Sequence, residues 1–282
     1  MTRYLRPVNL AEALQMRADH PEVTVFAGGT DLMVGALDRP ALAGMLDIFG
    51  LVELVGVRQE FDLIRIGAAT TYAQLIRDPL VNQYLPSLCA AAGEVGAVQV
   101  QARGTIGGNV ANSSPVGDML PVLLALDARV VIASSVAERH VHYRDFCTGY
   151  RQTVLSEDEL IVAFLISIPT SCSFQYWRKV GTRSAQATSK VMVAGYGEVV
   201  NTRVTRARVG IGAVADRPIR LTPVEELLVG ARIDASLIDR ARELTLECIE
   251  PISDVRSTRN YRRRVASNLV ARFVQRLTSV TF

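Results

Sequence analysis

Apolar residues along the chain follow two different periods, and the changes between them predict the order of helices and strands. Leu10, Ala13 and Leu14 have helical spacing, and Asn9 before them is a suitable N-cap. Short runs rich in β-branched residues predict strands instead. In the first part of the chain the predicted strands are residues 23–27, 45–48 and 63–67, and the predicted helices are residues 9–17, 71–76 and 85–95. This alternation indicates a small mixed or parallel sheet.

The pattern changes after residue 103. Residues 104–118 are polar and contain several glycines without either period, which predicts a long loop. A helix is then predicted at residues 119–126, followed by strands of a mostly antiparallel sheet at residues 129–133, 138–143 and 159–168. The order of elements predicts a first domain over residues 1–170, divided into subdomains of about residues 1–60 and 61–170.

A second domain is predicted beyond a break at residues 169–173. Its strands are predicted at residues 174–180, 191–200 and 205–214, and its helices at residues 223–229, 235–249 and 260–277. Three strands followed by three helices are typical of a separate α+β domain with a three-stranded antiparallel sheet, here residues 171–282. The whole chain is therefore predicted to be an α+β protein of two domains.

Net charge excludes one class of partner. The 282 residues carry 31 basic and 28 acidic side chains, a net charge of +3, and the arginines are scattered along the chain. Because a nucleic-acid-binding surface gathers its basic residues in a patch or stripe, we expect no nucleic-acid partner. The one dense basic run, residues 262–264, is interpreted as a solvated helix face, with a phosphate-binding patch as the alternative.

The sequence gives no sign of export or membrane insertion. Its N-terminus, MTRYLRPVNLAEAL, lacks the long apolar segment of a signal peptide. The longest apolar stretches, residues 119–126 and 160–168, fall well short of the roughly 20 residues that a membrane-spanning helix needs. We therefore expect a cytoplasmic protein without a membrane span.

The spacing of cysteines and histidines does not support a metal site. The four cysteines include no CxxC pair, so neither zinc nor an iron–sulfur cluster has local ligands. His140 and His142 share one face of a predicted strand, but no third ligand lies near them in the sequence. We predict no metal, and an electron carrier of this composition would need an organic cofactor.

Residues 25–32 (VFAGGTDL) end a predicted strand with two glycines, a hydroxyl and a carboxylate. Gly28 and Gly29 let the backbone approach a ligand closely and adopt positive φ. Successive N–H groups in such a turn can converge on an anion, and Thr30 adds a hydroxyl donor. Taken alone, the segment also fits an ordinary tight turn before a helix capped by Thr30 or Asp31. It is neither GxGxxG nor a lysine-bearing P-loop.

Residues 104–118 (GTIGGNVANSSPVGD) form the second glycine segment. A long polar loop in a compact domain is usually functional, although a purely structural loop is the alternative. Backbone amides, Thr105, Asn109 and Ser114 suit phosphates, and Asp118 suits the hydroxyls of a ribose or ribityl chain. Two such segments on two subdomains predict a dinucleotide whose pyrophosphate is held from both sides.

Together, AGGTDL at residues 27–32 and TIGGNVANSSPVGDMLPVLLALDARV at residues 105–130 resemble the FAD-binding medium subunits of molybdenum hydroxylases. That family includes xanthine dehydrogenases, aldehyde oxidases, carbon monoxide dehydrogenases and bacterial N-heterocycle hydroxylases. The resemblance runs the whole chain, through residues 177–191 (WRKVGTRSAQATSKV) and residues 251–273. It implies an FAD-binding domain of the vanillyl-alcohol-oxidase (PCMH) type followed by the family's C-terminal domain.

The resemblance also implies roles for individual residues. The glycine segments would wrap the FAD pyrophosphate, Asp118 would bind cofactor hydroxyls, and Ile66 and Ile161 would pack on the ring systems. Lys179 would lie close to the isoalloxazine, where a cation stabilises the reduced flavin without acting as a chemical catalyst; a surface lysine is the alternative. The residues implied in cofactor binding are Val25, Phe26, Ala27, Gly28, Gly29, Thr30, Asp31, Leu32, Ile66, Thr105, Gly107, Gly108, Asn109, Ala111, Ser114, Asp118, Ile161 and Lys179.

The implied activity is electron transfer within a larger oxidoreductase. A large subunit with molybdopterin would hydroxylate a purine or another N-heterocycle, a small subunit would carry two [2Fe–2S] clusters, and the FAD of this chain would pass electrons to NAD or another acceptor. The assembly would be a dimer of heterotrimers. One departure concerns NAD: some NAD-reducing relatives carry an acid in the loop after the lysine, whereas residues 181–190 contain Gln186 and no acid.

Two other functions compete with this interpretation. A free-standing FAD-dependent oxidoreductase with its own small-molecule substrate would need a base near the flavin. His140 and His142 are the candidate bases, and neither lies in a glycine segment. A non-catalytic nucleotide-binding module would bind the cofactor without reducing it.

Overall fold

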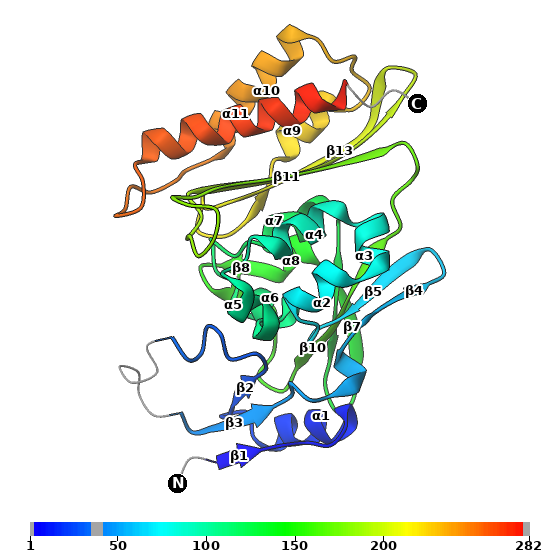
Figure 1. Ribbon diagram of the computed structural model, residues 1–282, viewed down its shortest axis with the longest axis vertical. Coiled ribbons are helices and arrows are strands. Elements are labelled where there is room, and N and C mark those ends of the chain that lie inside the picture. The colour runs from blue at the N-terminus through cyan, green and yellow to red at the C-terminus, as the bar shows by residue number, and fades with distance from the viewer. Residues whose placement is uncertain (1–2, 35–41, 279–282) are drawn as a thin grey trace.

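The computed structural model describes residues 3–34 and 42–278 of the chain. Its parts follow one another along the long axis of the molecule in nearly the order of the sequence (Figure 1). A small sheet and helix lie at the N-terminal end, a larger sheet covered by short helices lies in the middle, and a second sheet with three helices lies at the far end. The predicted α+β class is confirmed.

The N-terminal sheet is parallel, with strand order β1-β3-β2. Its elements are β1 (Arg3–Leu5), α1 (Leu10–Asp19), β2 (Thr24–Phe26) and β3 (Gly44–Asp47). Asn9 caps α1 as predicted, because its side-chain oxygen accepts a hydrogen bond from the backbone N–H of Glu12 at 2.9 Å. The prediction of a small mixed or parallel sheet is confirmed for this part.

The middle sheet is antiparallel throughout, with strand order β4-β5-β10-β6-β7. Its strands are β4 (Val57–Glu60), β5 (Leu63–Gly67), β6 (Arg129–Ala133), β7 (Glu138–His142) and β10 (Leu160–Ser167). The central strand β10 is buried on both faces, which explains its unbroken apolar run. The predicted subdomain division near residue 60 falls inside the β4–β5 hairpin, so β4 pairs with the second subdomain instead of the first.

Short helices cover one face of the middle sheet (Figure 1). They are α2 (Tyr72–Arg77), α3 (Pro79–Tyr84), α4 (Pro86–Gly93), α5 (Val98–Arg103), α6 (Ile106–Asn112), α7 (Leu120–Ala125) and α8 (Tyr143–Phe146). The smaller elements are η2 (Val52–Leu54), β8 (Cys147–Gly149) and β9 (Gln152–Thr153). Thr71 caps α2 and forms a capping box with Gln74.

The prediction of a continuous loop at residues 104–118 is wrong, because α6 occupies its first half. Two glycines near its start lower helix propensity. However, the N–H groups of Ile106 and Gly107 donate to the carbonyl oxygens of Thr70 and Ala68, at 3.1 Å and 2.8 Å. These long-range partners satisfy donors that a helix start otherwise leaves free, so the helix forms despite its sequence.

The C-terminal domain has four strands in the order β11-β12-β13-β14, all antiparallel. Its elements are β11 (Ser173–Val180), β12 (Val191–Val200), β13 (Arg203–Gly212), β14 (Ile219–Arg220), α9 (Thr222–Leu228), α10 (Ala235–Cys248) and α11 (Arg259–Leu277). The prediction of three strands missed β14, which is too short to show a period of two. Three helices follow the sheet among the described residues, as predicted.

Glycines allow helices to lie close against both faces of this second sheet. A Cβ on Gly195 would stand 2.4 Å from the Phe273 ring of α11, and a Cβ on Gly210 would stand 2.1 Å from the carbonyl oxygen of Pro121 in α7. Helix α7 of the first domain therefore lies directly on the C-terminal sheet. We call the contact between residues 84–127 and strands β11–β13 the domain seam.

The interpretation of residues 262–264 as a solvated helix face is wrong for Arg262. Its side chain is buried and donates to the carbonyl oxygens of Lys190 and Ala213, at 3.1 Å and 3.0 Å, and to Asp254 at 2.8 Å. Arg262 thus ties α11 to the ends of the sheet strands. Within residues 3–34 and 42–278, no helix combines the length and the apolar character needed to cross a membrane.

Candidate functional site

The two glycine segments, 75 or so residues apart in sequence, meet in space. Gly28 follows β2 and lies so close to the start of the second segment that a Cβ on it would stand 1.9 Å from the carbonyl oxygen of Arg103. On the other side, a Cβ on Gly104 would stand 3.2 Å from Thr30 Oγ1. Glycine at position 28 is therefore required by the approach of the two segments, whereas at position 104 the closest atoms to a Cβ would be the Tyr72 ring at 2.7 Å and the Val100 carbonyl oxygen at 2.9 Å. The predicted neighbourhood of the two segments is present in the structure.

The first segment carries a row of backbone donors for which the described residues offer no acceptor. Among the described residues, the N–H groups of residues 28–32 donate to no protein acceptor. Gly29 has a φ of +74°, which turns the chain so that successive N–H groups can converge. Unpaired backbone donors are rare unless water or a ligand accepts from them. The row therefore has the character of an anion receptor.

The second segment uses most of its polar groups internally but leaves a gap at its surface. Thr105 is buried and its hydroxyl caps α6 by accepting from the N–H of Gly108 at 3.1 Å. A Cβ on exposed Gly108 would meet only Thr105 Oγ1, at 3.0 Å, and otherwise open space. Asn109 Oδ1 is buried and accepts no hydrogen bond from the described residues. These features fit a phosphate-and-sugar ligand resting on Gly108 and reaching Asn109.

Asp118 and Lys179, predicted separately as cofactor residues, bind each other. Lys179 Nζ lies 2.6 Å from Asp118 Oδ2 and 2.9 Å from the carbonyl oxygen of Glu94, and the two side chains are only 5% and 10% exposed. Ser189 Oγ donates to Asp118 Oδ1 at 2.6 Å. Both carboxylate oxygens therefore have partners from the C-terminal domain. This geometry favours a positioning role for Asp118, because its oxygens are already occupied.

Burial dominates the electrostatics of this end of the seam. It raises the pKa of Asp118, and the charge of Lys179 and the hydrogen bonds from Lys179 and Ser189 offset the rise only in part. Burial also raises the pKa of Glu94. Since Lys179 is paired with a carboxylate, its positive charge is largely balanced where it stands. The sequence alone could not join these residues, because nothing in their spacing indicates a contact.

The other predicted site residues lie in several environments. Val25, Phe26 and Ala27 are half-buried on and after β2, whereas Asp31 is exposed. Ile66 is fully buried and Ile161 nearly so, both in the core beneath the helices. A flavin ring would have to be admitted into that core to touch Ile66. Three further residues within the segments are half-buried or exposed: Leu32, Ala111 and Ser114.

The two histidines stand apart from the glycine segments. His140 Nε2 lies 3.2 Å from Glu138, and His142 Nδ1 lies 3.8 Å from Asp127 at the opposite end of α7 from Asp118. Neither contacts residues 27–32 or 104–118. Within the part of the chain that the structure describes, no group of three or more histidine, cysteine, aspartate or glutamate side chains is placed to hold a metal ion.

Comparison with known proteins accounts for the whole chain. A family described as the FAD binding domain in molybdopterin dehydrogenase matches residues 1–171, and the CO dehydrogenase flavoprotein C-terminal domain matches residues 176–277. A putative xanthine dehydrogenase FAD-binding subunit of Escherichia coli strain K12 is 30% identical over 274 residues, which cover 96% of this chain and 94% of the relative. The carbon monoxide dehydrogenase medium chain of Afipia carboxidovorans is also 30% identical, over 97% of this chain and 95% of its own.

A solved structure agrees with these relatives. The crystal structure of quinoline 2-oxidoreductase from Pseudomonas putida 86 matches with a TM-score of 0.91 and 29% identity, covering 99% of this chain and 97% of that one. The match therefore includes both domains and the seam between them. With two glycine segments in contact, a row of unpaired backbone donors and family matches over both domains, the chain belongs to the FAD-binding medium subunits of the molybdenum hydroxylases.

Proposed function

We propose that this chain carries electrons from [2Fe–2S] clusters on a small partner subunit, through its FAD, to NAD or another acceptor. A large subunit with molybdopterin would hydroxylate the substrate, and the three chains would form a dimer of heterotrimers. FAD, when bound, supplies the acceptance and release of electrons. The residues of this chain hold it, orient it and shield it from water.

The observation that carries the proposal is the row of N–H groups at residues 28–32, which donate to no acceptor among the described residues and lie on a segment that contacts the start of the second glycine segment at Gly104. The row would bind the pyrophosphate, Gly108 would leave room for it, and Asn109 would hydrogen-bond the ligand. Lys179 and Asp118 would act from the seam by fixing the position of the second segment against the C-terminal domain.

The proposed substrate of the complex is a purine or another N-heterocycle. The substrate would bind on the large subunit, so this chain supports the proposal through its relatives alone. One relative is named for xanthine dehydrogenase and a matching structure is named for quinoline oxidation. Carbon monoxide dehydrogenase medium chains are similarly related, so substrate assignment needs the large subunit itself.

The loop at residues 181–190, which follows Lys179, contains no acidic residue, and hydrogen bonds fix its conformation. Arg183 donates twice to the carbonyl oxygen of Gln186, at 3.1 Å and 2.8 Å, and the N–H of Gln186 donates to the carbonyl oxygen of Gly96 at 2.8 Å. The loop is thereby fixed on the first domain beside the Lys179–Asp118 pair. The loop lacks the acid that some NAD-reducing relatives carry, so an acceptor other than NAD remains part of the proposal.

Purification of the tagged chain from its native cell tests the proposal. We expect two co-purifying subunits, with FAD, iron and molybdenum in the ratio 1:4:1 per heterotrimer, since two [2Fe–2S] clusters hold four irons. The flavin should be reduced on addition of a purine and reoxidised by NAD or by another acceptor tested in parallel. A yellow monomer that oxidises a small molecule alone would support a free-standing oxidoreductase, and a chain whose flavin no donor reduces would support a binding module.

A further inference from the structure

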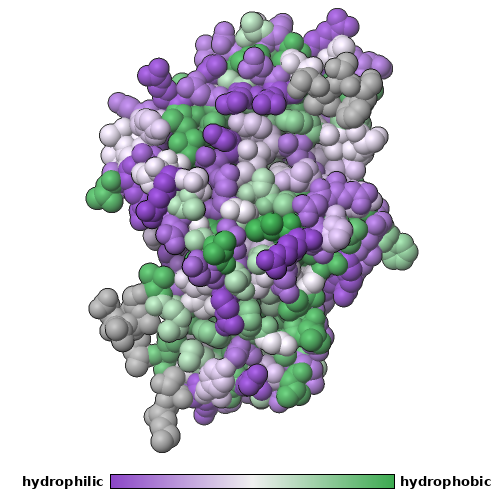
Figure 2. All heavy atoms as spheres, viewed as in Figure 1, coloured by the Kyte–Doolittle hydropathy of each residue, from purple (hydrophilic) through white to green (hydrophobic). Residues whose placement is uncertain are grey.

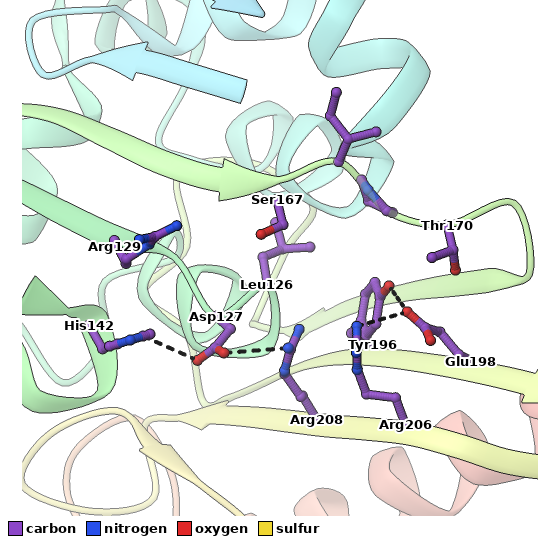
Figure 3. A pocket seen from close by; sticks show the side chains of 12 residues that line it. Leu126, Asp127, Arg129, His142, Ser167, Thr170, Tyr196, Glu198, Arg206 and Arg208 are labelled. Carbon is purple, nitrogen blue, oxygen red and sulfur yellow. Dashed lines mark hydrogen bonds and ion pairs between the residues drawn. The ribbon is translucent and has the colours of Figure 1, made fainter. Parts of the chain in front are cut away.

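A cavity of about 190 Å³ lies at the seam, at the end of α7 remote from the FAD segments. Its wall joins the end of α7, strand β7, the linker between the two domains and strands β12 and β13 (Figure 3). The lining side chains that carry the argument are Arg129, His142, Ser167, Thr170, Arg206 and Arg208. Because Asp118 precedes α7 and this cavity follows it, the cavity is separate from the FAD site.

The carboxylates at this cavity are already neutralised. Asp127 lies 3.4 Å from both Arg208 and Arg220 and 3.8 Å from His142. Glu198 accepts from the Tyr196 hydroxyl at 2.6 Å and from Arg206 at 3.2 Å. Each acid therefore has at least two donors around it, and little of its charge is left to repel an anion entering the cavity.

Arg129 is different from its neighbours because its guanidinium has no partner among the described residues. In Figure 3 it points into the cavity with no interaction drawn to it, whereas Asp127, Glu198 and Arg208 are all joined to other groups. It is half-buried at the start of β6, directly across from His142 in the strand register. A partly desolvated cation without a counter-charge is unfavourable, which indicates a place for an anion.

The positive charge around the cavity also favours binding of an anion. Burial lowers the pKa of the Arg208 guanidinium, and the nearby cations Arg220 and Arg206 lower it further against the pull of Asp127. The C-terminal domain on that side of the seam, residues 171–282, carries 19 arginines and lysines against 10 aspartates and glutamates. An anion in the cavity would relieve this crowding of positive charge.

We propose that this cavity binds a phosphate group, supplied as inorganic phosphate or as a phosphate monoester, with Arg129 as the principal ligand. The planar guanidinium matches two phosphate oxygens. Ser167 at the end of β10 and Thr170 on the linker add hydroxyl donors, and Arg206 and Arg208 add positive charge from the other domain. The ligand therefore touches both domains and the linker between them.

Calorimetric titration of the full-length chain tests the proposal. The chain is first saturated with FAD, so that the N–H row at residues 28–32 cannot bind the probe. Inorganic phosphate and glycerol 3-phosphate are titrated separately, with chloride at matched ionic strength as the reference. We expect one saturable site per chain for at least one probe. Tighter binding of the ester identifies a phosphate monoester as the ligand, and tighter binding of inorganic phosphate identifies the free ion.

Variants connect this binding to the cavity. Arg129→Gln should weaken phosphate binding by about tenfold or more, because a charge-assisted pair of hydrogen bonds is lost. Arg129→Lys, which keeps the charge and the apolar stem, should weaken it less and serves if the first variant does not fold. Arg77→Gln is the matched control, since Arg77 also lacks a partner among the described residues but is exposed on α2 away from the cavity. The proposal is overturned if the wild-type chain binds neither probe at millimolar concentration, or if both Arg129 variants bind as wild type does.

Discussion

The two ends of α7 face the same domain seam but differ in how their charges are paired. At the first end, Asp118 and Lys179 are almost fully buried and each has further hydrogen-bond partners. At the second end, arginines outnumber carboxylates, the groups are half-exposed, and a cavity remains between the domains. The seam is therefore closed around a buried ion pair at the end beside the glycine segments, whereas at its other end a cavity with excess positive charge remains.

The largest effect is expected from Lys179→Met, which leaves the buried Asp118 carboxylate without its cation. Removing one partner of a buried ion pair costs about 3 kcal/mol in the free energy of unfolding. Urea denaturation at pH 8 measures it. The folded-state pKa of Asp118 is already above its ordinary value of 3.8 and would rise further, so the variant should be destabilised more at pH 8 than at pH 5.

Two further variants test whether the carboxylate is the cause. Adding Asp118→Asn to Lys179→Met should restore part of the lost stability and remove its pH dependence. Arg178→Met, on the same strand but exposed, should change the free energy of unfolding by less than about 0.5 kcal/mol. Equal losses in the Lys179 and Arg178 variants would contradict the importance of the buried pair.

At the other end of α7, Arg220→Met should have a smaller effect, of about 2 kcal/mol. Arg220 is paired with Glu225 at 2.5 Å. In the variant, Glu225 would still accept a hydrogen bond from the N–H of Val209 at 2.8 Å, and Asp127 would still be paired with Arg208. Thermal or urea unfolding checks this ranking. If Arg220→Met proved more damaging than Lys179→Met, the second end would be the principal joint between the domains. Arg217→Met, whose exposed side chain pairs only with Asp216 among the described residues, is the control.

A substitution at Gly108 should lower FAD affinity without affecting phosphate binding in the cavity at the other end of α7. Gly108→Val adds a side chain where the protein leaves open space, so the free chain should fold with a loss below about 1 kcal/mol. FAD affinity should fall by tenfold or more, since the branched side chain would occupy the space of the pyrophosphate. Flavin content and fluorescence titration measure this, and unchanged FAD affinity would contradict the placement. Gly28→Ala, in contrast, should lower stability as well, because its Cβ would overlap Arg103.

The smallest change in the free energy of unfolding is expected for the half-exposed ion pair of Arg139 and Glu159, which lies away from the seam. Hydrogen bonds from Arg139 hold the pKa of Glu159 below its ordinary value of 4.5, so the stability they provide is present above that pH and is lost as pH falls through the folded-state pKa. Glu159→Gln should cost at most about 1 kcal/mol at pH 7 after screening by solvent. The difference from wild type should shrink steadily in unfolding experiments below pH 4.5. A difference independent of pH would mean that the pair contributes through packing alone.

The sequence predicted those elements whose signal is local. The cap at Asn9, the helix predicted at residues 71–76 and the apolar run of β10 each have a local sequence signature, and each is found in the structure. Helix α6 was missed because its start depends on carbonyl groups of Ala68 and Thr70, more than 30 residues earlier along the chain. Propensity alone argued against it.

For the site, too, the sequence predicted local features but not long-range contacts. The glycine segments could be recognised by type, because backbone approach to an anion requires glycine. The pairing of Asp118 with Lys179 could not, since the two residues are 61 positions apart and either could have faced the cofactor. The unpaired state of the Arg129 guanidinium among the described residues could not be predicted either. An arginine at a strand start has no special pattern, and only the structure shows which acids surround it.

The burial of β10 on both faces has a consequence for synthesis of the chain. Ala163 on β10 pairs with Gly67 on β5, so the middle sheet cannot close until about a hundred further residues have emerged from the ribosome. Strands β6 and β7 are synthesised within that interval, and the segment LIVAFLIS, an uncharged strand with high β-propensity, follows them. We expect the pairing of β10 with β5 and β6 to shield this segment from aggregation as the subunit folds.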